Sequence, residues 1–438
     1  MAVAFTTSTA QISTSSACTH YAAPGGTGNG LSAATPFKVS SFWAVAAPGT
    51  TLCLLDGTYT GTDAMIDPPD NLSGTASQPI TVRAVNDGGA LIDGQGRDKV
   101  VFLDRNSYWV LEGFNAARSG MVSVVRIINS TGTIVRRVAA WDAGDGNTSI
   151  FSTSYSSQTL FEDVAGWGIA RKTFAGSQGG NDLTCRRCWG RLEGSHVVGP
   201  KMTYTLAYSN YRMLIENSIG TWSGEKMKQT YVLLDYSGQP WTGHGAGIYT
   251  DYAVDQPYGI FSRDRLSNDL MARSRILGSI AYVSGASRFQ PSALYSFGKI
   301  DGVEIANSLA YIEPGSHPGK RAFDLEGLGR GVSAMALSAR SLIGVSSQTS
   351  LISPEWHPTR VFQGKSRLNV PDPYTTGQIC TRYQNGVLTS EPLWPWPMNQ
   401  RIIEAMIRSG RAPVDVTQTI EGMFGPIPAQ CRPDRSVR

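Results

Sequence analysis

Short apolar runs alternate with turn-forming residues along most of this chain. Each run is followed, across a charged or turn-prone pair, by a second apolar run, as in VLEGFNAA, IVRRVAAW and LFEDVAGW. From Glu112 to Glu216 the first residue of this central pair recurs every 24 to 30 residues. The copies are marked by Glu112, Arg136, Glu162, Arg186, Glu216, Leu277 and Ala306. This period indicates stacked coils, because one coil buries its apolar side chains only against the next.

The residues of each run favour strands over helices. The runs are rich in Val, Ile, Leu, Thr and aromatic residues and are bounded by Gly, Ser, Asn and Asp. A repeat of this length has no room for two helices and their turns, and the Asn-terminated ladder of leucine-rich repeats is absent from the sequence. The pattern therefore predicts an all-β chain folded as a parallel β-helix solenoid.

Three regions follow from changes in this pattern. Residues 1–78 are expected to form an N-terminal cap segment, and residues 79–365 the parallel β-helix, with a long Tyr- and Gly-rich excursion near 225–270. Residues 366–438 contain a proline cluster and an apolar periodicity that predicts a helix over 399–408. This small C-terminal cap region with short helices either covers the last coil or serves as a docking or oligomerisation module.

Composition and charge narrow the partners. The chain carries 48 Gly, 16% charged residues and a net charge of +4, with its arginines scattered, so a nucleic-acid partner is not expected. No uninterrupted run of eighteen apolar residues predicts a membrane span. The first residues lack the basic and apolar regions of a signal peptide. We expect an extracellular or virion-surface location, reached by lysis of a host cell or through a signal absent from this sequence.

Six cysteines are distributed in three pairs along the chain. They are Cys18, Cys53, Cys185, Cys188, Cys380 and Cys431. A disulfide in each terminal pair would staple a cap, where a solenoid frays. The central pair forms a single CxxC without a second one, so we expect these two cysteines to fill the core instead of holding a metal.

Several phrases carry a resemblance to a known family. HYAAPGGTGNG, DGTYTG and SGTASQPITVRAVNDGGALIDGQG, followed by SYWVLEGF, resemble the opening coils of the right-handed parallel β-helix superfamily. This superfamily includes pectate, alginate and chondroitin lyases and many phage and surface proteins. The resemblance covers about residues 20–350 and implies a right-handed solenoid. Because phage members are often trimeric, it also implies a homotrimer.

A lyase of this superfamily would need a basic residue and a neutralised substrate carboxylate. Lys or Arg removes a proton beside a uronate carboxylate, which Ca²⁺ or Arg neutralises. The candidates are Lys201 and Arg212, with Glu216 nearby in sequence. The alternative is that Lys201 caps a turn or pairs with Glu216.

A hydrolase would instead need clustered aspartates. Asp142 and Asp145 precede Asp163 by one coil, so stacking could bring the three acids together as an acid and a base. The alternative is a turn held by Asp, Gly and Asn side chains, with Ca²⁺ as a possible ligand. No cofactor is required by either interpretation.

Aromatic residues recur near the end of the second apolar run. They are Trp141, Trp167, Trp222, Tyr282 and Tyr311. Strand alternation directs the first two outward, so the row could form an exposed platform on which sugar rings stack. Alternatively, the rings pack under the excursion or against another subunit.

Two functions remain after this reading. One is a non-catalytic structural or adhesive surface protein, as in a phage virion or on a cell surface, whose β-helix face contacts polysaccharide or protein partners. The alternative is a polysaccharide lyase or glycoside hydrolase that acts on an acidic polysaccharide. The absence of a recognisable catalytic block favours the first, and the resemblance favours the second.

Overall fold

The structure is a computed structural model of the whole chain. It describes residues 17–120, 122–144, 148–194, 201–206, 212–222, 228–232, 248–252, 257–263, 274–283, 293–296, 303–312, 321–324, 333–335, 338–341, 379–380 and 382–431.

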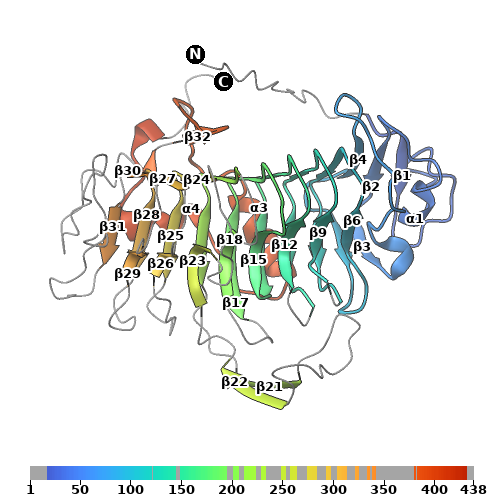
Figure 1. Cartoon of the computed structure of the whole chain (residues 1–438). Coiled ribbons are helices and arrows are strands. Elements are labelled where there is room, and N and C mark those ends of the chain that lie inside the picture. Colours follow the sequence, from blue (N-terminus) through green and yellow to red (C-terminus); the bar gives the residue numbers. More distant parts are fainter. Residues whose placement is uncertain are drawn as a thin grey trace.

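Three long parallel sheets wind around one core, which confirms the predicted all-β parallel β-helix (Figure 1). The first sheet contains β1 (His20–Ala22), β2 (Thr51–Leu54), β4 (Ile80–Ala84), β7 (Trp109–Glu112), β10 (Ile134–Arg136), β13 (Leu160–Glu162), β16 (Thr184–Arg186), β19 (Leu214–Glu216), β24 (Ser274–Leu277), β27 (Val303–Ala306) and β30 (Ser333–Met335). The second contains β3 (Gly57–Thr60), β5 (Ala90–Asp93), β8 (Asn115–Ala117), β11 (Ala139–Trp141), β14 (Ala165–Ile169), β17 (Trp189–Gly194), β20 (Ile219–Trp222), β25 (Ile280–Val283), β28 (Leu309–Ile312) and β31 (Ser338–Ser341). The third contains β6 (Val101–Asp104), β9 (Val125–Ile128), β12 (Ser149–Ser154), β15 (Lys172–Ser177), β18 (Lys201–Leu206), β23 (Pro257–Arg263), β26 (Ala293–Ser296) and β29 (Arg321–Asp324).

Short elements complete the described part of the chain. The antiparallel pairs are β21 (Lys228–Val232) with β22 (Ile248–Tyr252), and β32 (Arg382–Gln384) with β33 (Val387–Thr389). The helices are α1 (Val39–Phe42), η1 (Thr62–Ala64), α3 (Asn399–Arg408), α4 (Val416–Phe424) and η2 (Ala429–Cys431). The helix predicted over 399–408 is therefore confirmed. None of the described helices is long and apolar enough to span a membrane.

The central pair in the repeated phrase is the corner between the first and second sheets. Its second residue has a left-handed backbone in coil after coil, as at Gly113 (φ 76°), Asp163 (φ 51°) and Asn217 (φ 48°). Gly, Asn and Asp tolerate this conformation best. The left-handed residue turns the chain from one sheet into the next, so the sequence repeat and the structural corner coincide.

Large and small side chains complement each other inside the coils. On the third sheet Phe151, Phe174 and Tyr204 stack with ring centroids 5.0 and 4.7 Å apart. The second sheet places small residues in its inward row, with Gly166 in register with Gly190. A Cβ on Gly190 would lie 2.5 Å from Thr203 Cγ2 and 3.0 Å from the Phe174 ring. The glycines make room for the aromatic stack.

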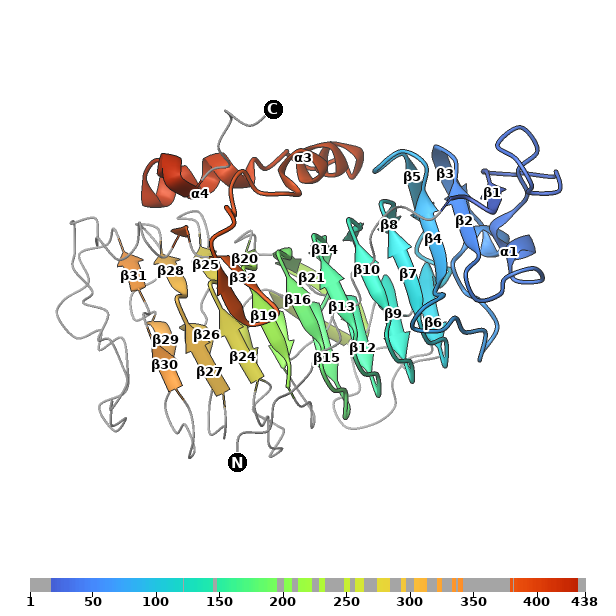
Figure 2. The same ribbon diagram turned by 90° about the horizontal axis from the view of Figure 1, so that it is seen from above.

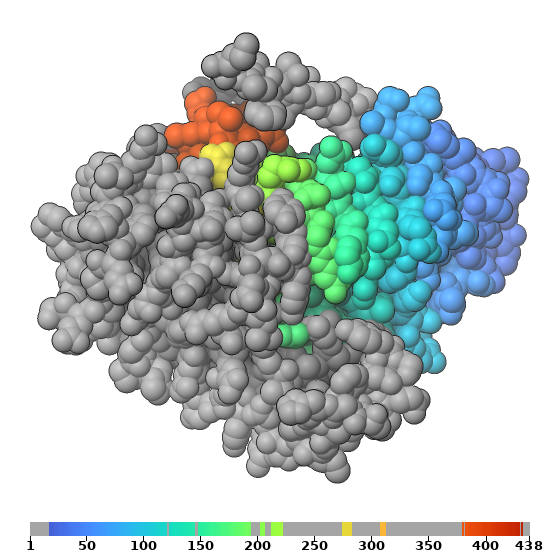
Figure 3. Space-filling view, in the orientation of Figure 1, coloured from blue at the N-terminus to red at the C-terminus, as the bar shows by residue number. Residues whose placement is uncertain are grey.

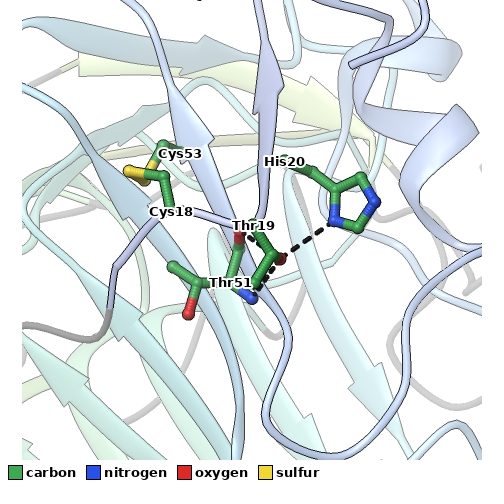
Figure 4. Close-up of a disulfide and its surroundings, with 5 residues drawn as sticks. All are labelled: Cys18, Thr19, His20, Thr51 and Cys53. Carbon is green, nitrogen blue, oxygen red and sulfur yellow. Dashed lines mark hydrogen bonds between the residues drawn. A yellow bond between two sulfur atoms is a disulfide. The ribbon is translucent and has the colours of Figure 1, made fainter. Parts of the chain in front are cut away.

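Both predicted disulfides are present. Cys18 is bonded to Cys53 beside a pair of hydrogen bonds between Thr19 and Thr51 (Figure 4), and Cys380 is bonded to Cys431. The first joins the chain before β1 to β2, which pair in parallel at the N-terminal end of the solenoid.

The central cysteines carry out the predicted packing role. Cys185 and Cys188 are free thiols, and both are buried among the apolar side chains of the coils.

The C-terminal segment, defined as residues 379–431, packs along the outer face of the second sheet (Figure 2). The space-filling view shows its described residues beside the coils (Figure 3). Buried Arg401 of α3 donates hydrogen bonds to Asp87 Oδ1 at 3.0 Å and Asn115 Oδ1 at 3.0 Å. These contacts tie residues more than two hundred positions apart and fix α3 along the side of the solenoid, while Val416 and Ile420 of α4 belong to the same apolar cluster as the second sheet.

The aromatic stack makes a prediction about Gly190. Gly190→Ala should lower the free energy of unfolding by about 1–3 kcal/mol, because the stiff Thr203 side chain leaves no space for a methyl group. Gly422→Ala is the control: its Cβ enters open space on α4, and the change should raise stability by about 1 kcal/mol. Urea unfolding of both variants measures the difference. Equal stabilities would contradict this account of the core.

Candidate functional site

A group of charged and aromatic residues gathers on the outer face of the third sheet. Ile66 bridges Val101, which places Asp67 beside Phe102, and Phe102 pairs with Arg126 of the next coil. Val101 lies in the core, so strand alternation directs Phe102 outward. We define Asp67, Lys99, Phe102 and Arg126 as the Phe102 site.

Two cations of this site lie close to the aromatic ring. Lys99 Nζ is 4.1 Å, and Arg126 Cζ 5.8 Å, from the centroid of the Phe102 ring. Both distances fall within the range of cation–π attraction. Lys99 Nζ is also 3.9 Å from Asp67 Oδ2. Arg126 Nε is buried and has no hydrogen-bond partner among the described residues. The site therefore holds a guanidinium group with unused donor capacity.

The carboxyl group of Asp67 has a raised pKa because it is partly buried. Burial raises the pKa of Asp67 above its ordinary value of 3.8; nearby Lys99 opposes this shift, and Asp70 adds to it. Asp70 itself forms an ion pair with Arg105. We call residues 67–70 the DPPD loop. In this loop Asp67 retains its proton more readily, and Asp70 is a carboxylate paired with Arg105. Such a contrast suits an acid and a base in one reaction.

Sequence reasoning missed this site. Its signals were the DPPD loop and the outward position of Phe102 in the alternating strand VFLD. Nothing in the sequence connects Asp67 with Arg126, because their proximity depends on the isolated bridge at Ile66 and on the register of β6 with β9.

The predicted aspartates lie in separate ion pairs. Asp142 accepts hydrogen bonds from Arg411 Nη2 at 2.6 Å and from the Ile169 N–H at 3.0 Å. Asp163 accepts two from Arg187, at 2.6 and 2.8 Å. Asp145 lies outside the described residues. The catalytic role of these acids stays a prediction, and the described partners of Asp142 and Asp163 are those of structural ion pairs.

The predicted lyase pair is only partly described. Arg212 forms an exposed ion pair with Asp182 at 2.7 Å. The side chain of Lys201 lies outside the described atoms. Glu216, proposed as its partner, accepts a hydrogen bond from Arg186 Nε at 2.5 Å and another from the Gly386 N–H at 2.8 Å.

A ladder of alternating charge runs along the first sheet. Arg136, Glu162, Arg186 and Glu216 occupy one register position in successive coils. Glu162 bonds Arg136 at 2.8 Å and Arg186 at 3.0 Å. Burial alone would raise the pKa of Glu162, but Arg187 and Arg136 outweigh it, and the pKa lies below its ordinary value of 4.5. Glu162, Arg186 and Glu216 are buried and Arg136 is partly exposed, and their mutual pairing joins the coils.

The predicted aromatic row points outward from the second sheet, as expected, but its rings are not exposed to solvent. Trp141 pairs with Trp167, and Tyr282 with Tyr311, in one outward row of the second sheet. All four are buried, with 0 to 5% of each residue exposed, because the C-terminal segment covers them. Trp167 Nε1 donates to Ser409 Oγ at 3.2 Å, and Tyr311 packs against Phe424.

Trp222 does not belong to this row. It pairs with Leu192 and Val283, one register position beyond Thr221, which is the residue aligned with Tyr282. Its side chain lies outside the described atoms. Sugar stacking at the covered rings would require the C-terminal segment to move away.

No group of three or more His, Cys, Asp or Glu side chains that could hold a metal ion occurs within the described part of the chain. A Ca²⁺ site stays a prediction for the turn that contains Asp145.

Comparisons with known proteins agree with the fold. No family profile and no curated protein matches the chain. Among solved structures, a rhamnogalacturonan lyase is 14% identical over 93% of this chain and 98% of its own, with a TM-score of 0.45. The pectate lyase Pel9A is 17% identical over 80% and 78% of the two chains, with a TM-score of 0.38. A GH136 lacto-N-biosidase from Eubacterium ramulus is 12% identical over 80% and 67%, with a TM-score of 0.50.

The similarity to the lacto-N-biosidase concerns the fold and does not identify the activity. The strand pairing of the chain itself shows the parallel β-helix architecture that its opening phrases implied.

The charge ladder predicts a pH-dependent stability. Because the pKa of Glu162 is lower in the folded protein, its ion pairs stabilise the fold above the ordinary pKa, and this contribution is lost as pH falls. Glu162→Gln should lower the free energy of unfolding by about 3 kcal/mol at pH 7, and by much less at pH 3. Urea unfolding at both values tests this. The control is Glu404→Gln, on the exposed face of α3, which should leave stability unchanged. If Glu162→Gln lowers the free energy of unfolding equally at both pH values, the ladder does not act through its charges.

Proposed function

We propose that this protein is an extracellular enzyme that binds and hydrolyses an acidic polysaccharide at the Phe102 site. The observation that carries the proposal is Arg126, whose buried Nε has no hydrogen-bond partner among the described residues, beside an outward aromatic ring and a carboxyl group of raised pKa. The disulfides Cys18–Cys53 and Cys380–Cys431 support the location, because such bonds persist in oxidising compartments.

Binding would use the cations and the ring together. A guanidinium group recognises a carboxylate through two parallel hydrogen bonds, so Arg126 is suited to a uronate group. Lys99 would add a second positive charge. Phe102 adds apolar surface for the nonpolar side of a sugar, and Ser152, in register with Arg126, continues the same row with a hydroxyl group. A polymer of charged sugars matches this combination better than a neutral one.

Cleavage would use the two acids of the DPPD loop. Hydrolysis of a glycosidic bond needs one protonated carboxyl group for the leaving oxygen and one carboxylate to activate water or attack the sugar. The raised pKa suits Asp67 to donate the proton. Asp70, paired with Arg105, would supply the carboxylate. As the glycosidic C–O bond breaks, Asp67 gives its proton to the leaving oxygen, water adds its oxygen to the anomeric carbon, and the Asp70 carboxylate takes the remaining water proton.

One assay distinguishes this proposal from its rivals. The protein is incubated with polygalacturonate and with alginate, while new reducing ends and the absorbance of unsaturated uronates are followed. Reducing ends without absorbance support hydrolysis. Absorbance would indicate a lyase and contradict the role of Asp67 as acid. Binding with neither product would leave the adhesive surface protein as the function.

Arg126 provides the sharpest test of binding. Arg126→Gln should weaken binding of the acidic polymer roughly 10- to 100-fold, the effect of losing a charge-assisted hydrogen-bond pair. Arg212→Gln removes the same charge from an exposed ion pair and should leave binding unchanged. Affinity electrophoresis in gels containing the polymer measures both. The reverse pattern would favour the lyase residues predicted from the sequence.

Asp67 makes a prediction about pH. Catalysis should fall as pH rises above the pKa of Asp67, because the proton donor is then ionised, and Asp67→Asn should lower kcat about 10²- to 10⁴-fold. A carboxyl group with a raised folded pKa destabilises the fold as pH rises, so the same variant should unfold at higher urea at pH 7 and show little difference at pH 3. Retained activity in a folded variant would exclude Asp67 as the acid.

A further inference from the structure

The corner between the third and first sheets carries a row of exposed side chains with left-handed backbones. Arg105 (φ 56°), Asn129 (φ 51°), Tyr155 (φ 49°) and Gln178 (φ 57°) follow the strands β6, β9, β12 and β15. The backbone N–H of each of the first three donates to a carbonyl group of the next coil, so the row is aligned. All four side chains are exposed.

Tyr155 is the residue in this row that folding does not explain. The left-handed conformation is costly for a bulky side chain, whereas Asn or Gly adopts it easily, as Asn129 does one coil earlier. Burial of the ring could offset such a cost, but Tyr155 is 59% exposed. A tyrosine that is strained and largely in water points to a role outside folding.

A second tyrosine lies three positions along the same corner. Tyr108 (φ 58°) precedes Gly132 by one coil, and a Cβ on Gly132 would lie 2.6 Å from the Tyr108 ring. The ring of Tyr155 is likewise beside a glycine of the next coil, 3.9 Å from the position of a Gly179 Cβ. At Gly132 the missing Cβ leaves room for the Tyr108 ring, whereas a Cβ at Gly179 would make only an ordinary van der Waals contact with Tyr155.

Three neutral amides lie in the same two rows as the rings, and one of them, Asn129, donates through Nδ2 to Asp104 Oδ1 at 2.9 Å. Asn129 and Gln178 lie in the coils before and after Tyr155, and Gln158 lies in the row that contains Gly132. Coils repeat every 4.8 Å or so, which places these amides within reach of one bound molecule. The charges at the ends of both rows are already paired, Arg105 with Asp70 and Arg212 with Asp182.

We propose that this corner, defined as Tyr108, Asn129, Tyr155, Gln158 and Gln178, binds a neutral oligosaccharide that runs across the coils. Aromatic faces pack against the C–H face of a sugar ring, and amides donate to and accept from its hydroxyl groups. The site is distinct from the Phe102 site, whose two cations, Lys99 and Arg126, favour a charged polymer. It would hold a neutral chain or side branch without reacting with it.

The variant Tyr155→Asn tests this proposal, because it should weaken sugar binding without weakening the fold. The variant relieves the backbone strain, so its melting temperature should stay the same or rise by about 1–2 °C. Its affinity for a neutral polysaccharide should fall at least about fivefold, the loss of one aromatic contact. Both are measured on the full chain, by thermal unfolding and by electrophoresis in native gels containing xylan, galactan or dextran.

The control is Leu31→Asn, which removes a 65% exposed apolar side chain outside the corner and should leave gel mobility unchanged. Weaker retardation of Tyr155→Asn at an equal or higher melting temperature supports the site. Undiminished retardation, a lower melting temperature, or a wild-type protein that none of the three gels retards would each overturn it. Failure to bind polygalacturonate or alginate would refute the proposed function and leave this inference standing.

Discussion

In-register stacking of the coils is the constraint on which the rest of the structure depends. Each side chain lies above and below its counterparts in the neighbouring coils, so the identity of one row decides whether the coils attract each other. The alternation of Arg136, Glu162, Arg186 and Glu216 satisfies this condition with charge, and Phe151, Phe174 and Tyr204 satisfy it with aromatic stacking. The left-handed corner residues keep the coils equal in shape, and without them neither row would align.

Because stacking repeats one kind of side chain along each outer face, the three sheets differ in what covers them. The second sheet carries an outward apolar row, and the C-terminal segment buries it. Trp394 and Trp396 of that segment belong to the same buried cluster. The first sheet carries the charge ladder, and the hairpin of β32 and β33 closes over it through hydrogen bonds from the Asn385 and Gly386 N–H groups to Glu216. The outer face of the third sheet carries the Arg126 guanidinium beside the Phe102 ring, and Arg126 Nε has no hydrogen-bond partner among the described residues. This difference is why we place function there.

The local pattern was sufficient for the coils, the corner residues and the packing of Cys185 and Cys188, because those features repeat within one coil and its neighbours. It was insufficient for the site. Asp67 meets Phe102 through an isolated bridge outside the regular strands, a contact that no periodicity announces. The local pattern also could not predict the burial of Trp141 and Trp167. Alternation sets their outward direction, but residues 379–431 bury them.

The sequence by itself determined that this protein is a solenoid of parallel strands, and which side of each strand faces the core. Period-two alternation and turn-forming residues act over a few positions, so they can be read locally. Only the tertiary structure decided which outward side chains meet solvent and which meet one another. Coverage of Trp167 by Ser409, and alignment of Asp67 with Phe102, depend on the path of the chain through three dimensions, where distance along the sequence no longer measures distance in space.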